Sequence, residues 1–109
     1  MPGEPIHPNV SVTHEQIAAF CEKWKIVKLE LFGSVLRDDF DAESDIDVLA
    51  TFGESVRLTI GAILDMEDEL RDLFQRDVDL VERKVVEKNP NWVRRRRILN
   101  SARLIYAAA

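Results

Sequence analysis

The stretch Leu31–Phe52, LFGSVLRDDFDAESDIDVLATF, decides how the rest of the chain is interpreted. It places Gly33 and Ser34 directly after an apolar run and returns ten residues later with two aspartates one residue apart, Asp45 and Asp47. Residues two apart in a strand point to the same face, so both carboxylates would project together while the residue between them turns into the core. A solvated turn followed by surface acids has the same pattern, so the neighbouring segments have to be considered.

Apolar periodicity on either side of this stretch predicts three helices and three strands. The residues Thr13 and Gln16 form a capping-box pattern at the start of the first helix. Asn89 is the expected N-cap of the last helix, with Pro90 in its first turn. The expected elements are a helix at 13–25, strands at 26–32 and 45–52, a helix at 56–76, a strand at 77–81 and a helix from 89 to about 106. This order predicts an α/β or α+β fold, a small mixed β-sheet flanked by helices.

Length and composition indicate one small globular domain. The chain has 109 residues, of which 46% are hydrophobic and 32% are charged, a composition that argues against disorder. We expect residues 1–12 to form a loose lead-in without the features of a signal peptide, and residues 13–109 to form the domain. The single cysteine, Cys21, excludes a disulfide framework within the chain, and no apolar run approaches a membrane span. A cytoplasmic location is therefore expected.

Charge is distributed unevenly along the chain, although the net charge is only -5. From Leu29 to Glu82 there are 16 acidic against 4 basic residues, whereas from Arg83 onward there are 8 basic residues and one acid, Glu87. An acidic middle suits cations and a basic end suits an anionic partner, but ordinary solvated faces produce the same asymmetry.

The paired aspartates are candidate metal ligands. Neighbouring carboxylates repel each other, and Mg²⁺ relieves that repulsion by binding one or two carboxylates together with substrate phosphates. Asp77 and Asp79 also share a face, and either could complete a three-carboxylate cluster with Asp45 and Asp47 if the two strands pair. Such a cluster binds two metal ions and aligns an in-line displacement at phosphorus. Taken singly, each motif is more typical of surface acids or of a charged strand edge.

Gly33 and Ser34 supply the candidate phosphate site. Glycine lets the backbone approach a phosphate closely, and the serine hydroxyl and nearby N–H groups can donate to its oxygens. Arg37, three residues after Ser34, could reach the same phosphate. A lone Gly-Ser pair after a strand is usually a turn, and it is the occurrence of this pair in order with the aspartates that favours a phosphate site.

The motif GSVLRDDFDAESDID (33–47) resembles the GS-x10-DxD signature of the nucleotidyltransferase superfamily related to DNA polymerase β. The later segments VDLV (78–81) and ILNSARLIYA (98–107) resemble those of minimal nucleotidyltransferases, the MNT or MntA-like antitoxins. The resemblance covers roughly Val27 to Ala107. It implies a polymerase-β-like nucleotidyltransferase fold.

The resemblance also implies roles for individual residues. Gly33 and Ser34 would hold the triphosphate of ATP, with Arg37 nearby; Asp45 and Asp47 would bind Mg²⁺, and the VDLV match favours Asp79 as the third acid. Family loops often have Arg-Gly where this chain has Arg37 followed by Asp38 and Asp39. The extra acids either weaken nucleotide binding or help to recruit metal.

Three functions are consistent with this resemblance. The first is a Mg²⁺-dependent adenylyltransferase that transfers AMP from ATP to a HEPN-domain toxin and thereby acts as its antitoxin. The second is a non-catalytic binding module that neutralises such a partner by occlusion. The third is transfer to a small molecule, which usually requires an additional substrate-binding domain.

The other candidate functional residues, in the C-terminal part of the chain, have weaker support. The run Arg94–Arg97 covers a full helical turn, so its side chains cannot all reach one ligand, and it is either solvated or directed at an acidic partner or RNA phosphates. A wide basic face with aromatic residues is missing, so direct nucleic-acid binding is not expected. Trp92 is ambiguous between core, partner contact and adenine platform, and Tyr106 is expected to pack at a helix end.

Overall fold

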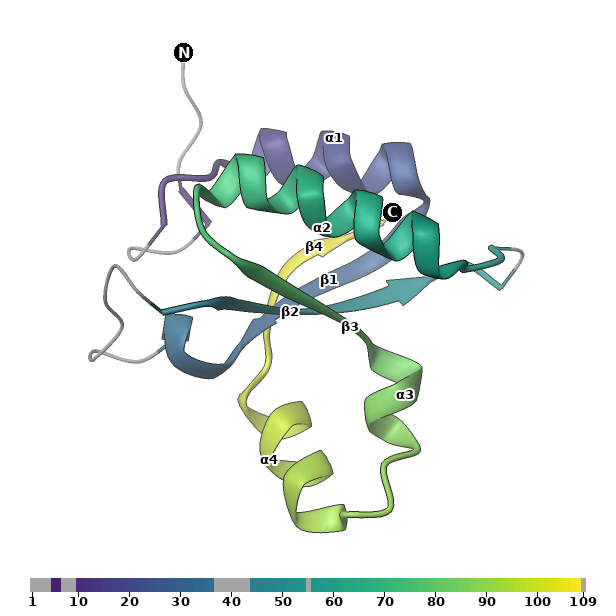
Figure 1. The fold of residues 1–109 in the computed structure, drawn as a ribbon. Coiled ribbons are helices and arrows are strands. Elements are labelled where there is room, and N and C mark those ends of the chain that lie inside the picture. Colours follow the sequence, from purple (N-terminus) through teal and green to yellow (C-terminus); the bar gives the residue numbers. More distant parts are fainter. Residues whose placement is uncertain (1–4, 7–9, 37–43, 55, 109) are drawn as a thin grey trace.

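One mixed β-sheet of four strands organises the chain, in the order β3-β2-β1-β4 (Figure 1). The computed structural model describes residues 5–6, 10–36, 44–54 and 56–108. The strands are β1 (Ile26–Phe32), β2 (Ile46–Phe52), β3 (Val78–Glu82) and β4 (Arg103–Ala107). The strand β1 pairs antiparallel with both β2 and β4, whereas β3 pairs parallel with β2. The mixed sheet predicted from the sequence is therefore present, with one strand more than predicted.

Helices cover the sheet on both sides, and the main core lies on only one of them. Two long helices, α1 and α2, lie together on one side, and two shorter ones, α3 and α4, lie on the other (Figure 1). Their bounds are α1 (His14–Trp24), α2 (Ile60–Phe74), α3 (Arg83–Glu87) and α4 (Trp92–Ser101), and a 3₁₀ turn, η1 (Gly33–Leu36), follows β1. The main core lies under the long helices. Its contributors from these two helices are Ile17, Phe20, Cys21, Met66, Leu70 and Phe74.

The first helix begins where the capping pattern predicts. Thr13 Oγ1 accepts from Gln16 N at 3.2 Å, and Gln16 Oε1 accepts from Thr13 N at 2.9 Å, so the capping box is confirmed. The second helix starts later than predicted, at Ile60. Thr59 is its N-cap, because its hydroxyl accepts from Ala62 N at 3.0 Å.

The last helix was predicted incorrectly in its second half. The helix α4 ends at Ser101, and Ala102 adopts an extended conformation with ψ 134° that leads into β4. The run Leu104–Tyr106 has strand propensity, and the free edge of β1 lets its backbone pair, with Leu29 opposite Tyr106. Ile105 is consequently buried as a strand residue rather than as part of the predicted helix.

Two further sequence predictions about this half of the chain need correction. The N-cap of α4 is Asn91, whose side chain accepts from Arg94 N at 3.2 Å, rather than Asn89. The short helix α3 was not predicted. Tyr106 packs partly buried against the core from β4, not from a helix end.

Described residues of the predicted lead-in pack against the domain. Ile6, Val10 and Val12 are buried in the main core, and Ile6 N donates to Val12 O at 2.9 Å. Within the described ranges, no helix is both long and apolar enough to cross a membrane.

Candidate active site

Three side chains line up across the sheet at the end where β1 leads into η1. Phe32 on β1 is opposite Asp47 on β2, and Asp47 is in turn opposite Asp79 on β3. Residues in register on adjacent strands project from the same face, with strands about 4.8 Å apart. A cavity of about 260 Å³ lies over this row and is closed from the other side by residues of α3, α4 and the segment between them. Its lining residues are Phe32, Asp47, Asp79, Val81, Val85, Val86, Asn89, Arg94 and Ile98.

Gly33 brings the backbone of the turn directly against Asp47. A Cβ added at Gly33 would lie 2.3 Å from Asp47 Oδ2, and the glycine has a φ of +79°, in the left-handed region. No other residue type fits without displacing the carboxylate or straining the backbone. The glycine turn and the aspartate of the motif are therefore in close contact, through η1 and β2. The side chain of Ser34 and the whole of Arg37 lie outside the described residues.

The carboxylates interact electrostatically. Burial raises the pKa of Asp47, and the negative charges of Asp79 and then Asp45 raise it further. Asp45 itself is exposed and directly precedes β2. The deprotonated form of Asp47 is thus disfavoured, as expected for carboxylates that share one end of the sheet.

Asp79, rather than Asp77, lies beside Asp47. Asp77 is exposed and its side chain forms an ion pair with Arg71 Nε at 3.5 Å, while its carbonyl accepts from Ile46 N at 2.9 Å. The strand β3 is held in this register also by α2, because Glu67 Oε2 accepts from Leu80 N at 2.9 Å. Of the two acids left open at the sequence level, Asp79 is the one in register with Asp47, and its role as the third carboxylate stays a prediction.

The donor set fits a hard divalent cation. Among the described residues, no group of three or more acidic, histidine or cysteine side chains is arranged to hold a metal ion. Asp47 and Asp79 nevertheless form a register pair whose mutual repulsion a cation would relieve. Mg²⁺ binds through one or two carboxylates and completes its shell with water and phosphate oxygens, so these two residues suffice as its protein ligands.

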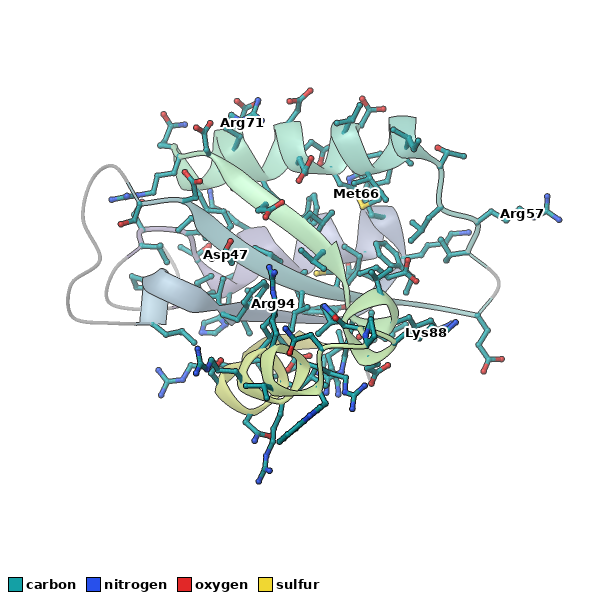
Figure 2. All side chains as sticks on the ribbon, turned by 60° about the horizontal axis from the view of Figure 1, so that its bottom comes forward. Asp47, Arg57, Met66, Arg71, Lys88 and Arg94 are labelled. Carbon is teal, nitrogen blue, oxygen red and sulfur yellow. The ribbon has the colours of Figure 1, made fainter. Side chains whose placement is uncertain are left out.

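Two arginines of α4 belong to the same site, which the sequence argument did not establish. Arg94 lines the cavity that holds Asp47 and Asp79, and Figure 2 shows Arg94 extending from α4 toward the sheet, on the side where Asp47 lies. Arg94 and Arg97 also line an adjoining cavity of about 710 Å³ together with Gly33. The signal in the sequence was the spacing: residues 91, 94, 97, 98 and 101 recur at intervals of three or four positions along the helix, with 97 and 98 adjacent, and so share one helical face.

A largely buried ion pair connects α3, one of the two helices beside the site, to the sheet. Arg83 Nη1 lies 2.6 Å from Glu30 Oε1, with side-chain exposures of 23% and 10%. It connects the start of α3 to β1 across the sheet. Arg83 Nε also lies 3.5 Å from Glu87 Oε2, within α3. Glu30 is a charged side chain in a residue that is only 7% exposed, and this pairing compensates for its burial, because a buried charge requires a partner.

Sequence comparison identifies the family. The sequence model described as "Nucleotidyltransferase domain" matches residues 14–105. Two proteins of Methanocaldococcus jannaschii, "Putative protein adenylyltransferase MJ0126" and "Putative protein adenylyltransferase MJ0128", are 33% and 38% identical to this chain over 69 residues. Each match covers 63% of this chain and 67% of the relative.

Structural comparison gives the same fold. The chain is similar to a chain of a toxin-antitoxin crystallised with AMP-PNP, with a TM-score of 0.66 and 18% identity over 87% of this chain and 73% of the other. A "putative minimal nucleotidyltransferase" has a TM-score of 0.62 and 27% identity, over 82% and 85% of the two chains. The tri-AMPylated HEPN toxin of Shewanella oneidensis in complex with MNT antitoxin also contains a similar chain, with a TM-score of 0.59 and 18% identity over 87% and 70%.

These matches agree with the geometry of the sheet end, where a glycine turn contacts one carboxylate and a second lies in register beside it. The resemblance found in the sequence is confirmed: the chain belongs to the nucleotidyltransferase domain family and is a nucleotidyltransferase of the minimal, polymerase-β-like kind.

Proposed function

We propose that this chain is a Mg²⁺-dependent adenylyltransferase that transfers AMP from ATP to a hydroxyl of a HEPN-domain toxin and acts as the antitoxin of that protein. The observation that carries the proposal is the contact between Gly33 and Asp47, with Asp79 in register beside them. Support comes from relatives named as protein adenylyltransferases and from similar chains in complexes named for AMP-PNP and for an AMPylated HEPN toxin.

In this proposal, the carboxylates and the glycine turn have separate tasks. Asp47 and Asp79 hold Mg²⁺, which when bound neutralises charge on the reacting phosphate, and Asp45 is the further ligand that the family motif implies. The backbone at Gly33 approaches the triphosphate closely because no side chain intervenes. Ser34 and Arg37 donate hydrogen bonds to the phosphate oxygens, the role that the family motif implies for them.

The reaction is an in-line displacement at the α-phosphorus. The acceptor hydroxyl oxygen forms a bond to that phosphorus, and the bond from the phosphorus to the bridging oxygen of the β-phosphate breaks. Pyrophosphate leaves with the bonding electrons, and Asp79 takes the hydroxyl proton. The product is an AMP ester of the acceptor.

The test uses ATP labelled on its α-phosphate, with Mg²⁺, the protein and the HEPN-domain protein encoded next to it. We expect label on the partner, and its loss by a factor of about 10³ or more in Asp45→Asn/Asp47→Asn, because removal of metal ligands costs several kcal/mol of transition-state stabilisation. Asp77→Asn is the matched control: its side chain pairs with Arg71 instead, so transfer should be retained.

Three outcomes are informative. Transfer by Asp45→Asn/Asp47→Asn at the unmodified rate would contradict the metal assignment. Tight binding of the partner without any label would favour neutralisation by occlusion. Labelling of small molecules instead of the partner would favour the third alternative considered above.

A further inference from the structure

The wall of the site opposite the carboxylates is basic. Arg94 lines the cavity over Asp47 and Asp79, and Arg97 lines two adjoining cavities beside Gly33, of about 710 and 460 Å³. The cavities are continuous in their lining, because Phe32 and Ile98 border all three. The site therefore has acidic groups on the sheet and guanidinium groups on α4, with the glycine turn between them.

Only two of the four consecutive arginines have this position. Arg94 and Arg97 are three residues apart and lie on the helical face that also presents Asn91 and Ile98 to the cavity. Arg95 has a different task, since its Nη1 donates to Asn89 O at 3.0 Å and fixes the segment before the helix. Arg96 lines none of the three cavities that Arg94 and Arg97 line.

The arrangement is electrostatically unfavourable unless an anion binds. Four consecutive arginines, Arg94–Arg97, begin at the third residue of α4, whose first turn contains no acidic residue. The N-terminal end of a helix carries partial positive charge, and neighbouring like charges repel each other, so both effects destabilise α4. Within the described residues, neither Arg94 nor Arg97 forms an ion pair that would offset this cost.

We propose that Arg94 and Arg97 bind the β- and γ-phosphates of the nucleoside triphosphate, the part that leaves as pyrophosphate. This inference rests on the proposed function, which makes a nucleoside triphosphate the substrate. A triphosphate placed between the carboxylates and the backbone at Gly33 would have its outer phosphates in the space that Arg94 and Arg97 line. Arginine is suited to this task because its planar group donates two hydrogen bonds to one phosphate.

The experiment compares the binding of ATP, AMP and pyrophosphate, each with Mg²⁺ and without the partner protein, by titration calorimetry. We expect Arg94→Gln and Arg97→Gln each to raise the Kd for ATP and for pyrophosphate about tenfold or more, because charge-assisted hydrogen bonds are lost. The Kd for AMP should change less than about twofold, since AMP lacks the β- and γ-phosphates. Arg96→Gln, with the same charge change on the same helix, should bind all three ligands as the unmodified protein does.

Each contrary result identifies what fails. Equal ATP affinity in Arg94→Gln, Arg97→Gln and Arg96→Gln would overturn the inference, as would equal losses for ATP and AMP. Loss of toxin binding with ATP affinity unchanged would assign the arginines to the protein interface instead. No binding of ATP or pyrophosphate by the unmodified protein would also overturn it.

The failure of the proposed function has a different signature. If ATP and pyrophosphate bind through Arg94 and Arg97 but no label reaches the partner, the inference stands and AMP transfer does not. Thermal unfolding of each variant checks that a change in Kd does not reflect loss of fold. Higher pyrophosphate affinity in Arg97→Lys than in Arg97→Gln would show that the positive charge itself is required.

Discussion

The two faces of the sheet are built from alternate residues of the same strands and have opposite properties. On β2, Ile46, Val48 and Ala50 are fully buried in the main core, toward α1 and α2. Asp47, between two of them, lies on the opposite face, in the cavity that Asp79 and Arg94 also line. Farther along β2, Leu49 is fully buried, so the polar site is confined to the end of the strand near η1.

This difference shows how a small domain separates stability from chemistry. Successive side chains of a strand point to opposite faces, so a shift of one residue in register would exchange the two sets. The core face determines the register, because burying Asp47 and exposing its apolar neighbours would be costly. The core thereby positions the carboxylates, although they contribute no packing to it.

The largest expected effect on stability is at the core face of the sheet, where truncating a side chain tests whether the two faces are independent. Leu70→Ala, at a position with 0% exposure on α2, should lower the free energy of unfolding by about 2–5 kcal/mol, because a cavity is left in close packing. Leu64→Ala on the same helix, where the side chain is 55% exposed, should change it by less than about 0.5 kcal/mol. Denaturant unfolding measures both. Well below the transition, Leu70→Ala should bind ATP normally, and a marked loss of affinity would mean that the faces are coupled.

A substitution in the glycine turn should affect stability less than Leu70→Ala does, but it should also change ATP binding at the site. Gly33→Ala should cost about 1–2 kcal/mol of stability, because alanine is disfavoured at a positive φ. It should also lower ATP affinity, since the new Cβ displaces the Asp47 carboxylate. Gly53→Ala is the control: a Cβ there would meet its nearest atoms only at 3.9 Å. Equal behaviour of the two variants in unfolding and binding assays would contradict the close contact between η1 and β2.

The smallest expected effect has the opposite sign. Asp47→Asn should slightly stabilise the metal-free protein at pH 7, by less than about 1 kcal/mol after solvent screening, because it removes a carboxylate that its surroundings disfavour. The pKa of Asp47 is raised in the folded state, so its ionisation weakens folding above that pKa and has no effect where both states are protonated. The advantage of Asp47→Asn should therefore shrink as the pH falls through the raised pKa. Thermal unfolding of both proteins across this pH range measures it, and a lower Tm for Asp47→Asn at pH 7 would contradict it.

Local patterns predicted much of the architecture. The capping box at Thr13, the alternation along β2 and the periodicity of α2 are each determined within a few residues, so they could be inferred without knowing any long-range contact. The same holds for half of the site: Gly33 and Asp47 belong to one motif, and the structure brings them into contact.

The remaining features depend on partners far away in the chain. The strand β4 reads equally well as the end of a helix, and only the open edge of β1 decides in favour of pairing. The burial of Glu30 likewise depends on Arg83, which follows it by more than fifty positions.

What the sequence determined by itself was therefore the set of elements from α1 to β3 and the acid-bearing motif between the first two strands, because hydrophobic period and capping are local properties. The parallel register of β3 places Asp79, the acid that the family motif favoured, beside Asp47, and tertiary structure alone decided that Arg94 and Arg97 face the site. The physical reason is that strand register and helix docking are determined by which surfaces bury each other. Those buried surfaces belong to segments far apart in the chain, so their contacts cannot be inferred from a local sequence pattern.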